Sequence, residues 1–235
     1  MSAAVLGARA PTDGVLVSVA SPERVVRACA SVGLDRACLT PEERGRMLRL
    51  VRQEDRSTYL AAHLLARFVT GLRTGLRPTD LCYKQCCPEC QGRDHGAPWI
   101  ESFSGRRFEV SVSHTAGLVA AVAGHAWIDV EAVASCAGPM AGALTNADED
   151  EALRRPDPAL ARARCWTIKE SLVKQGVLGL DDACRWSAGP LDGDLVRISC
   201  GAHTRCCAFL RTPPGYAGAI SLSSPTPTDI EELNL

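Results

Sequence analysis

Asp129 and Glu131 stand two residues apart in an apolar run that is rich in β-branched residues. Such a run predicts a β-strand, and a strand turns residues i and i+2 to the same face. Both carboxylates are therefore expected to point the same way. An acid pair at this spacing is also common on solvated surfaces, but two parallel carboxylates are ligands that Mg²⁺ binds in proteins.

A second group of residues with chemical potential follows at helical spacing. Trp166, Glu170 and Lys174 succeed one another at intervals of four, which stacks them on one face of a helix. Lys169 lies about 100° round the helix from Glu170. A carboxylate and an ammonium group one turn apart, together with the upstream acid pair, indicate a site for a magnesium ion and phosphate groups.

The order and spacing of these residues resemble the signature of the Sfp-type 4′-phosphopantetheinyl transferases. That signature reads Gly-Ile/Val-Asp-x-Glu, followed by Trp/Phe-Ser/Thr-x-Lys-Glu-Ala/Ser-x-x-Lys. The second block matches at each fixed position, and the first matches except that Trp127 stands where the family usually has Gly. A third family element, a Ser-His-Ser/Thr turn, is matched at 113–115. The resemblance extends from about Arg49 to Lys174.

This resemblance implies an enzyme that moves 4′-phosphopantetheine from coenzyme A to a serine of an apo acyl or peptidyl carrier protein and releases adenosine 3′,5′-bisphosphate. The carriers would serve polyketide, nonribosomal-peptide or fatty-acid synthesis. Asp129, Glu131 and Glu170 would bind Mg²⁺ through hard oxygen ligands. Glu170 is also the candidate base for the serine hydroxyl, and Lys174 would stabilise phosphate charge or the alkoxide. Lys169 is expected either to contact the coenzyme phosphates or to face solvent.

Basic side chains recur at helical spacing further upstream, at Arg49, Arg52, Arg56, His63 and Arg67. A stripe of this kind is usually a solvated helix face. The resemblance implies instead that Arg56 and Arg67 contact the coenzyme phosphates, for which a guanidinium group is well suited. It also implies a phosphate contact for His114, and the structural alternative is a histidine that caps its turn.

Cysteines and a histidine cluster between residues 82 and 95, at Cys82, Cys86, Cys87, Cys90 and His95. Thiolate and imidazole groups at such spacing are typical of tetrahedral Zn²⁺ sites, so a zinc ion at Cys87 and Cys90 is one interpretation. The other is a loop of reduced thiols packed against the body of the protein. The run from His95 to Pro98 resembles a His-Gly-x-Pro segment of family members, which implies that His95 contacts the coenzyme.

The chain has 235 residues, 46% hydrophobic residues and a formal net charge of −1. This composition is typical of a soluble globular protein and argues against bulk binding to nucleic acid. No apolar run reaches the roughly eighteen residues that a membrane span needs, and the N-terminus does not read as an export signal. We therefore expect a cytoplasmic monomer without membrane contact, whose twelve cysteines are reduced.

The pattern of elements predicts an α+β fold. Strands are expected at 15–20, 108–112, 118–123, 127–133, 195–200, 205–211 and 217–223, and helices within 41–71 and at 148–153 and 159–175, with Thr40 as an N-cap. The resemblance implies a pseudo-dimer of two similar helix-plus-antiparallel-sheet halves, with coenzyme and metal in the cleft between them. We predict a first half at 1–125, a second at 126–224 and a disordered tail at 225–235.

Two other functions are compatible with the sequence. A non-catalytic paralogue that binds coenzyme A or a carrier protein would retain the same motifs, and Trp127 is the residue that points to it. A zinc-dependent nucleic-acid-binding module would use the cysteine cluster and the arginine-rich helix. The near-neutral charge and the single Cys-x-x-Cys pair weigh against this second alternative.

Overall fold

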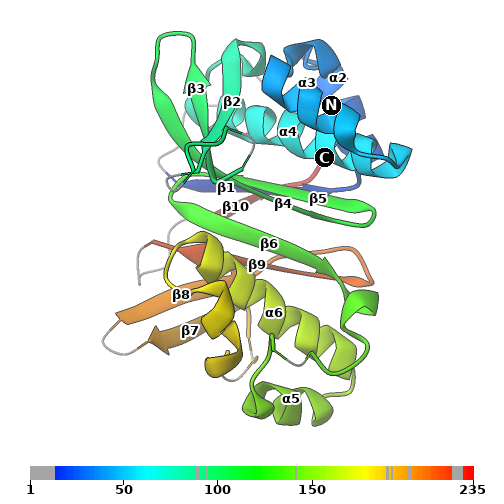
Figure 1. Ribbon diagram of the computed structural model, residues 1–235, viewed down its shortest axis with the longest axis vertical. Coiled ribbons are helices and arrows are strands. Elements are labelled where there is room, and N and C mark those ends of the chain that lie inside the picture. The colour runs from blue at the N-terminus through cyan, green and yellow to red at the C-terminus, as the bar shows by residue number, and fades with distance from the viewer. Residues whose placement is uncertain are drawn as a thin grey trace. The chain divides into compact units, whose positions relative to one another are not determined.

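The computed structural model describes residues 14–87, 90–93, 95–140, 142–188, 191, 193–200, 203–223 and 230–235. The chain is an α+β protein with two sheets, as the sequence predicts (Figure 1). It divides into two compact units. Residues 230–235 belong with the part of the chain that ends at His125, and the second unit begins at Ala126.

The first unit is built on a six-stranded sheet with the order β10-β1-β5-β4-β3-β2. Its strands are β1 (Val15–Ala20), β2 (Leu81–Cys86), β3 (Ala97–Ser102), β4 (Arg107–Thr115), β5 (Leu118–Ala123) and β10 (Ile230–Leu233). Paired strands run antiparallel except β1 and β10, which are parallel. Every residue of β5 is buried, because this strand lies between β1 and β4 and is covered by helix.

The α-helices that the structure describes in this unit are α2 (Pro22–Ala30), α3 (Pro41–Arg49) and α4 (Gln53–Thr74). The long helix α4 packs against the sheet, and α2 and α3 pack against α4 (Figure 1). Thr40 caps α3 as predicted, because its hydroxyl accepts from the backbone N–H of Glu43 while the Glu43 carboxylate accepts from the N–H of Thr40. Helix α2 is not among the predicted helices, although Ser21 caps it.

The predicted loop around the cysteine cluster is shorter than expected, because two unpredicted strands flank it. Strands β2 and β3 pair in register from Leu81 opposite Ser102 to Cys86 opposite Ala97. Cys82 and Cys86 therefore lie in a strand, and the loop proper covers 87–96. The cysteines in β2 masked its alternation of buried Leu81 and Tyr83 with more exposed neighbours.

The disorder predicted for the C-terminal tail is wrong for residues 230–235. Strand β10 pairs with β1 from Val15 opposite Ile230. The Ser18 hydroxyl donates to the carbonyl oxygen of Leu233 at 3.0 Å, and Leu233 and Leu235 pack against the core. The acidic composition of this segment concealed a strand that is held by backbone pairing with a buried neighbour.

The second unit has a four-stranded antiparallel sheet with the order β6-β9-β8-β7. Its strands are β6 (Ala126–Ala132), β7 (Leu195–Cys200), β8 (His203–Phe209) and β9 (Tyr216–Leu222), and its helices are α5 (Asn146–Leu153) and α6 (Pro158–Lys174). Helix α6 packs against β6 and β9 and contributes Ile168 and Leu172 to the core. All these elements are predicted by the sequence to within a few residues.

Short 3₁₀ helices cover Arg36–Cys38, Pro78–Asp80, Val133–Cys136 and Leu180–Arg185. Among the described residues, none of the helices combines the length and the apolar character needed to cross a membrane. The cysteines whose side chains the structure describes form no disulfide with one another.

Candidate active site

The two acids of β6 lie on one face of the strand. Asp129 is paired with Ala219 of β9 and Glu131 with Ala217, so the small neighbouring residues leave room for both carboxylates. Asp129 is buried, and Glu131 is half-buried. The strand geometry that the sequence predicts is therefore present at both acids.

Helix α6 brings Glu170 and Lys174 to these acids. The Lys174 ammonium group donates to Asp129 Oδ1 at 2.7 Å and to the carbonyl oxygen of Ile128 at 3.0 Å. Glu170 lies one turn earlier on the same face of the helix and is half-buried. The second unit thus gathers three carboxylates and one ammonium group from the two sequence blocks.

The charges in this cluster influence one another. Burial raises the pKa of the Glu170 carboxyl, and the negative charge of Asp129 adds to that increase. Lys174 partly offsets the increase, and Glu131 contributes a smaller increase. Three carboxylates lie near Lys174 in this cluster, so a bound cation would relieve the repulsion among them.

The donor set fits Mg²⁺ in its chemistry, because carboxylate oxygens are the hard ligands that this ion prefers. Asp129 Oδ1 accepts from Lys174, and Glu131 Oε1 accepts from the backbone N–H of Ala132 at 2.7 Å. Within the described part of the chain, oxygens of the three carboxylates do not all lie within 4.8 Å of one another. Coordination by all three would therefore require side-chain rotations.

Lys169, predicted to contact coenzyme phosphates or face solvent, does neither. Its ammonium group is buried and donates to Asp148 Oδ2 at 2.7 Å and to the carbonyl oxygens of Ala143 and Ala183 at 3.1 and 2.9 Å. These three acceptors match the three N–H groups of an ammonium ion. The Lys169 side chain therefore holds the interior of the second unit together.

Arg67, predicted as a coenzyme ligand, is likewise an interior residue. Its guanidinium group is 0% exposed and donates to both carboxylate oxygens of Glu43, at 2.8 and 2.6 Å. It also donates to the carbonyl oxygens of His63 and Leu81, at 2.9 and 3.1 Å. These contacts join α3, α4 and β2, so this arginine stabilises the first unit and is closed to ligands.

The remaining predicted coenzyme ligands of the first unit stay at or near the surface. Arg56 is half-buried, and its Nε donates to the carbonyl oxygen of Leu50 at 2.8 Å. His114 is exposed near the end of β4, opposite Val119 of β5. His95 is exposed in the 87–96 loop, where its Nε2 lies 3.1 Å from Cys90 Sγ. These positions are compatible with the predicted phosphate contacts.

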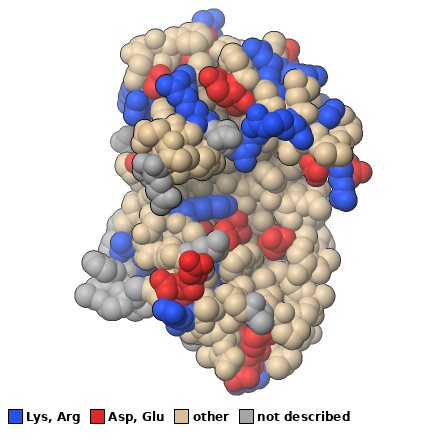
Figure 2. Space-filling view, in the orientation of Figure 1, with Lys and Arg blue, Asp and Glu red and all other residues tan. Residues whose placement is uncertain are grey.

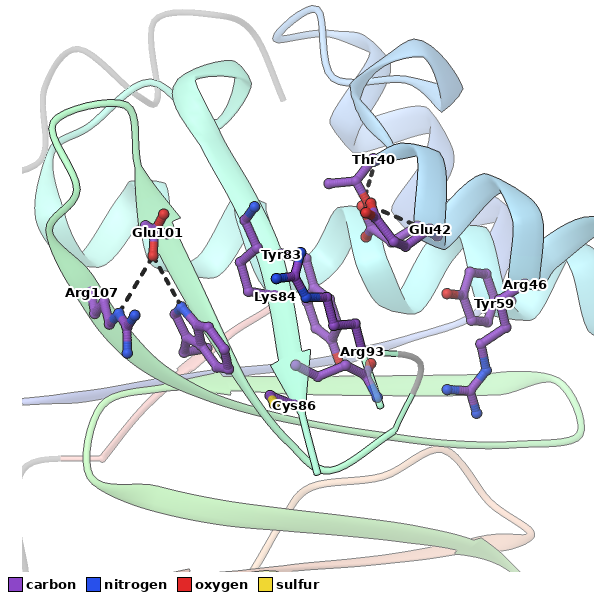
Figure 3. Close-up of a pocket in the computed structure, with 13 residues that line it drawn as sticks. Thr40, Glu42, Arg46, Tyr59, Tyr83, Lys84, Cys86, Arg93, Glu101 and Arg107 are labelled. Atoms are coloured by element: carbon purple, nitrogen blue, oxygen red, sulfur yellow. Dashed lines mark hydrogen bonds and ion pairs between the residues drawn. The ribbon is translucent and has the colours of Figure 1, made fainter. Parts of the chain in front are cut away.

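A pocket of about 310 Å³ opens in the first unit between the helices and the β2–β3 hairpin (Figure 3). Cationic side chains from α3, β2, β4 and the 87–96 loop line it: Arg46, Lys84, Arg107 and Arg93. In Figure 3, Arg46 comes from the helical side and Lys84 from β2. On the face of this unit shown in Figure 2, Lys and Arg side chains are interspersed with acidic and uncharged residues.

Aromatic rings and carboxylates complete the pocket. The Tyr59 and His63 rings are stacked, with their centroids 3.9 Å apart. The centroids of the His63 and Tyr83 rings are 4.3 Å apart, and the two ring planes form an angle of 50°. On the strand side, the Arg107 guanidinium lies 4.9 Å from the Trp99 ring centroid and 3.4 Å from Glu101 (Figure 3). The pocket can therefore offer cationic groups to an anionic ligand.

Sequence reasoning missed the pocket because Lys84, Trp99 and Glu101 lie on strands that were not predicted. The sequence signal for these strands was the alternation of buried and more exposed residues in β2. Lys84 stands opposite Trp99, and Cys82 opposite Glu101, a pairing that appears only once the hairpin is recognised.

Comparisons with known proteins add little. No family model matches the chain, and no curated protein matches it. Among solved structures, it is similar to Helicobacter pylori holo-[acyl-carrier-protein] synthase in complex with coenzyme A, with a TM-score of 0.32 and 17% sequence identity over 47% of this chain and 97% of the other. A likeness this weak establishes neither a shared fold nor a shared activity.

Proposed function

We propose that this protein transfers the 4′-phosphopantetheine group of coenzyme A to a serine hydroxyl of an apo acyl or peptidyl carrier protein, with Mg²⁺ as cofactor. The observation that carries the proposal is the packing of α6 on β6, which gathers Asp129, Glu131, Glu170 and Lys174. These four residues are the acids of the first sequence block and a glutamate and a lysine of the second. The resemblance of those blocks to the Sfp-type transferases supplies the reaction.

Asp129, Glu131 and Glu170 would hold the metal ion, and the half-buried positions of the two glutamates keep them within reach of a ligand. When bound, Mg²⁺ would neutralise negative charge on the pyrophosphate of the coenzyme. Lys174 adds a positive charge beside Asp129. Because its side chain is 29% exposed, it can shift from the carboxylate to a phosphate oxygen without crossing the interior.

The proposed reaction is an in-line displacement at phosphorus. The serine oxygen of the carrier forms a bond to the phosphorus that bears the pantetheine arm, and the bond from that phosphorus to the bridging oxygen breaks. Adenosine 3′,5′-bisphosphate leaves with the bridging oxygen, and the serine proton passes to Glu170, directly or through water. Burial and the neighbouring acids raise the pKa of the Glu170 carboxyl, and a bound Mg²⁺ would act in the opposite direction.

The first unit would supply contacts to the coenzyme phosphates. Arg46, Lys84 and Arg93 line its pocket, and charge-assisted hydrogen bonds from such groups to phosphate oxygens are among the strongest in proteins. His114 and Arg56 are proposed as further phosphate contacts. Arg67 and Lys169 are omitted from this proposal because both are buried in ion pairs.

Intact-mass spectrometry of an apo carrier domain tests the proposal. Incubation with the protein, coenzyme A and Mg²⁺ should add about 340 Da to the carrier, as expected for a phosphopantetheine group on serine. A chelator should prevent the gain, and Glu170→Gln should abolish it. Glu54→Gln, which changes an exposed glutamate in the first turn of α4, should leave the gain intact.

Unchanged turnover in Glu170→Gln would refute the assignment of the base. No gain with any of several carrier classes, while coenzyme A still binds, would refute the transferase and support the non-catalytic paralogue. Salt-dependent binding of an oligonucleotide without any coenzyme binding would support the nucleic-acid-binding alternative.

A further inference from the structure

The 87–96 loop brings together the side chains of Cys87, Cys90 and His95. The ligand atoms of all three lie within 4.8 Å of one another, and Cys90 Sγ lies 3.1 Å from His95 Nε2. Zn–S bonds of about 2.3 Å and Zn–N bonds of about 2.0–2.1 Å place the ligand atoms of a tetrahedral site about 3.5–3.8 Å apart. Small side-chain rotations would therefore fit one zinc ion among these atoms.

The backbone fixes the two ends of this loop against each other. Gly96 has a φ of +102°, and a Cβ added there would lie 2.3 Å from the carbonyl oxygen of Cys86. Glycine allows this close approach, because no other residue combines that φ with the space available. Since His95 precedes Gly96 and Cys87 follows Cys86, the approach holds two of the candidate ligands next to each other.

Hydrogen bonds within the loop place the third candidate. The N–H of Cys87 donates to the carbonyl oxygen of Gly92 at 2.9 Å. The N–H of Gln91 donates to the carbonyl oxygen of Cys87, also at 2.9 Å. Gln91 has a φ of +58°, which reverses the chain directly after Cys90. The N–H of Gly92 then donates to Cys90 Sγ at 3.4 Å, a contact that orients this sulfur within the loop.

The burial of these side chains does not support a packing role. Cys90 and His95 are exposed, and Cys87 is half-buried, whereas structural cysteines such as Cys29 and Cys165 are completely buried. A loop of thiols packed as small apolar residues would be expected to resemble Cys29 and Cys165. The geometry therefore favours the metal interpretation over the packing interpretation.

We infer that Cys87, Cys90 and His95 form a Zn²⁺ site, with a water molecule or a neighbouring side chain at the remaining coordination position. Two thiolates and an imidazole select zinc over magnesium, so this site is chemically distinct from the carboxylate cluster of the second unit. His95 is then a metal ligand and not a coenzyme contact. The inference does not depend on the transferase activity.

The position of the site suggests what the ion does. Arg93 lies between Cys90 and His95 in the loop and lines the pocket of the first unit, as does Cys86 at the end of β2 (Figure 3). An ion bound by residues before and after Arg93 in the sequence would restrict the motion of the loop. It would thereby hold the Arg93 side chain at the wall of the pocket. This role rests on the proposed use of the pocket for phosphates, whereas binding of the ion does not.

Metal analysis of untagged protein, purified under reducing conditions, supplied with Zn²⁺ and then desalted, tests the site. One zinc per chain is expected, and Co²⁺ in its place should give the thiolate charge-transfer band and the intense visible bands of a tetrahedral site. Cys90→Ser and His95→Ala should lose the stoichiometric metal. Cys82→Ser, in β2 outside the cluster, and His125→Ala, an exposed histidine elsewhere in the unit, should keep it.

Less than stoichiometric zinc in the wild type, without a thiolate-to-cobalt band, would overturn the inference, and this measurement requires no variant to fold. Equal zinc retention by Cys90→Ser and Cys82→Ser would overturn it as well. A zinc-loaded protein that transfers no phosphopantetheine would leave the metal site established and refute only the proposed function. A protein that binds no zinc but catalyses the transfer would support the proposed function and refute the metal site.

Discussion

The guanidinium group of Arg67 is joined to the carboxylate of Glu43 by two hydrogen bonds, at 2.8 and 2.6 Å, in an interior where the two side chains are 0% and 4% exposed. His63 Nδ1 lies 2.6 Å from Glu43 Oε1, and the N–H of Thr40 donates to Oε2. Each oxygen of the Glu43 carboxylate therefore has two hydrogen-bond partners. Glu43 also lines the pocket and lies on the same helix, α3, as Arg46. The Arg67–Glu43 pair therefore stabilises the helix that carries Arg46.

Glu43→Gln should destabilise the first unit strongly, since it leaves the positive charge of Arg67 buried without a counter-ion. Removing one partner of a buried ion pair costs about 3–5 kcal/mol. Hydrogen exchange measured by mass spectrometry should show the loss in α3 and α4. The control is Asp80→Asn, which breaks the exposed pair with Arg77 and should cost about 0–1 kcal/mol. Equal effects from the two variants would contradict the expected role of burial.

The same cluster predicts a stability that falls with acid. Burial raises the pKa of Glu43, but the hydrogen bonds from His63 and Arg67 outweigh this effect and lower the pKa to about 2. The unfolded chain therefore takes up a proton as the pH falls below about 4.5, before the folded chain does. The stability that Glu43 contributes is present above pH 4.5 and is lost between 4.5 and 2.

His63 extends this dependence to higher pH. Burial lowers its pKa from 6.5, although Glu43 acts in the opposite direction, so His63 donates from Nδ1 in its neutral form and Arg67 carries the charge. Acid destabilisation should begin below pH 6.5. Urea unfolding at several pH values tests this, and Glu43→Gln should flatten the slope between pH 4.5 and 2. A first unit that gains stability on acidification would contradict the assignment.

The sequence predicts the acid cluster well because its geometry is local. Asp129 and Glu131 share a strand, and Glu170 and Lys174 share a helical face, so period-two and period-four spacing suffice for each pair. Arg67 and Lys169 were misassigned for the complementary reason. Their partners lie 24 and 21 residues away, at Glu43 and Asp148, and no local pattern shows that a cation is buried.

The unpredicted strands have a related explanation. Strands β2 and β10 are stabilised by pairing with β3 and β1 respectively, and neither has a long apolar alternation of its own. β-propensity depends on such neighbours more than helix propensity does. The pocket was missed with β2 and β3, since its strand-side lining exists only after the two strands pair.

Lys169→Met should destabilise the second unit. The substitution leaves the Asp148 carboxylate buried without its cation, although Ser187 and the N–H of Ala188 continue to donate to Oδ1. A loss of about 3–5 kcal/mol is expected for such a broken pair. Hydrogen exchange should increase in α5 and α6 and remain unchanged in α4. Unaltered protection of α6 would show that Lys169 is not a structural residue.

Lys174→Met should affect turnover more than folding. Its side chain is 29% exposed, so less interior structure depends on it than on Lys169. If Lys174 stabilises charge that develops during transfer, kcat should fall about 100-fold, as for the loss of other preorganised donors. The comparison uses the initial rate of carrier modification together with the melting temperature of each lysine variant. Wild-type turnover in Lys174→Met would exclude this lysine from the mechanism.

Arg46→Ala and Lys84→Ala should weaken the binding of coenzyme A while leaving kcat nearly unchanged. Each variant removes a pocket cation, and hydrogen bonds to charged groups contribute about 1.5–3 kcal/mol. An increase in KM of about 10- to 100-fold is therefore expected. Arg77→Ala removes an exposed cation of the same unit that does not line the pocket and should leave KM unchanged.

Dephospho-coenzyme A shows which phosphate the pocket binds. This analogue lacks the 3′-phosphate, so a cation that contacts only that group loses its advantage with the analogue. A variant whose KM is raised with coenzyme A but matches the wild type with the analogue therefore contacts the 3′-phosphate. A variant that is impaired with both donors contacts the pyrophosphate. If neither pocket variant changes KM for either donor, the pocket does not bind the coenzyme, and its cations serve another anionic ligand.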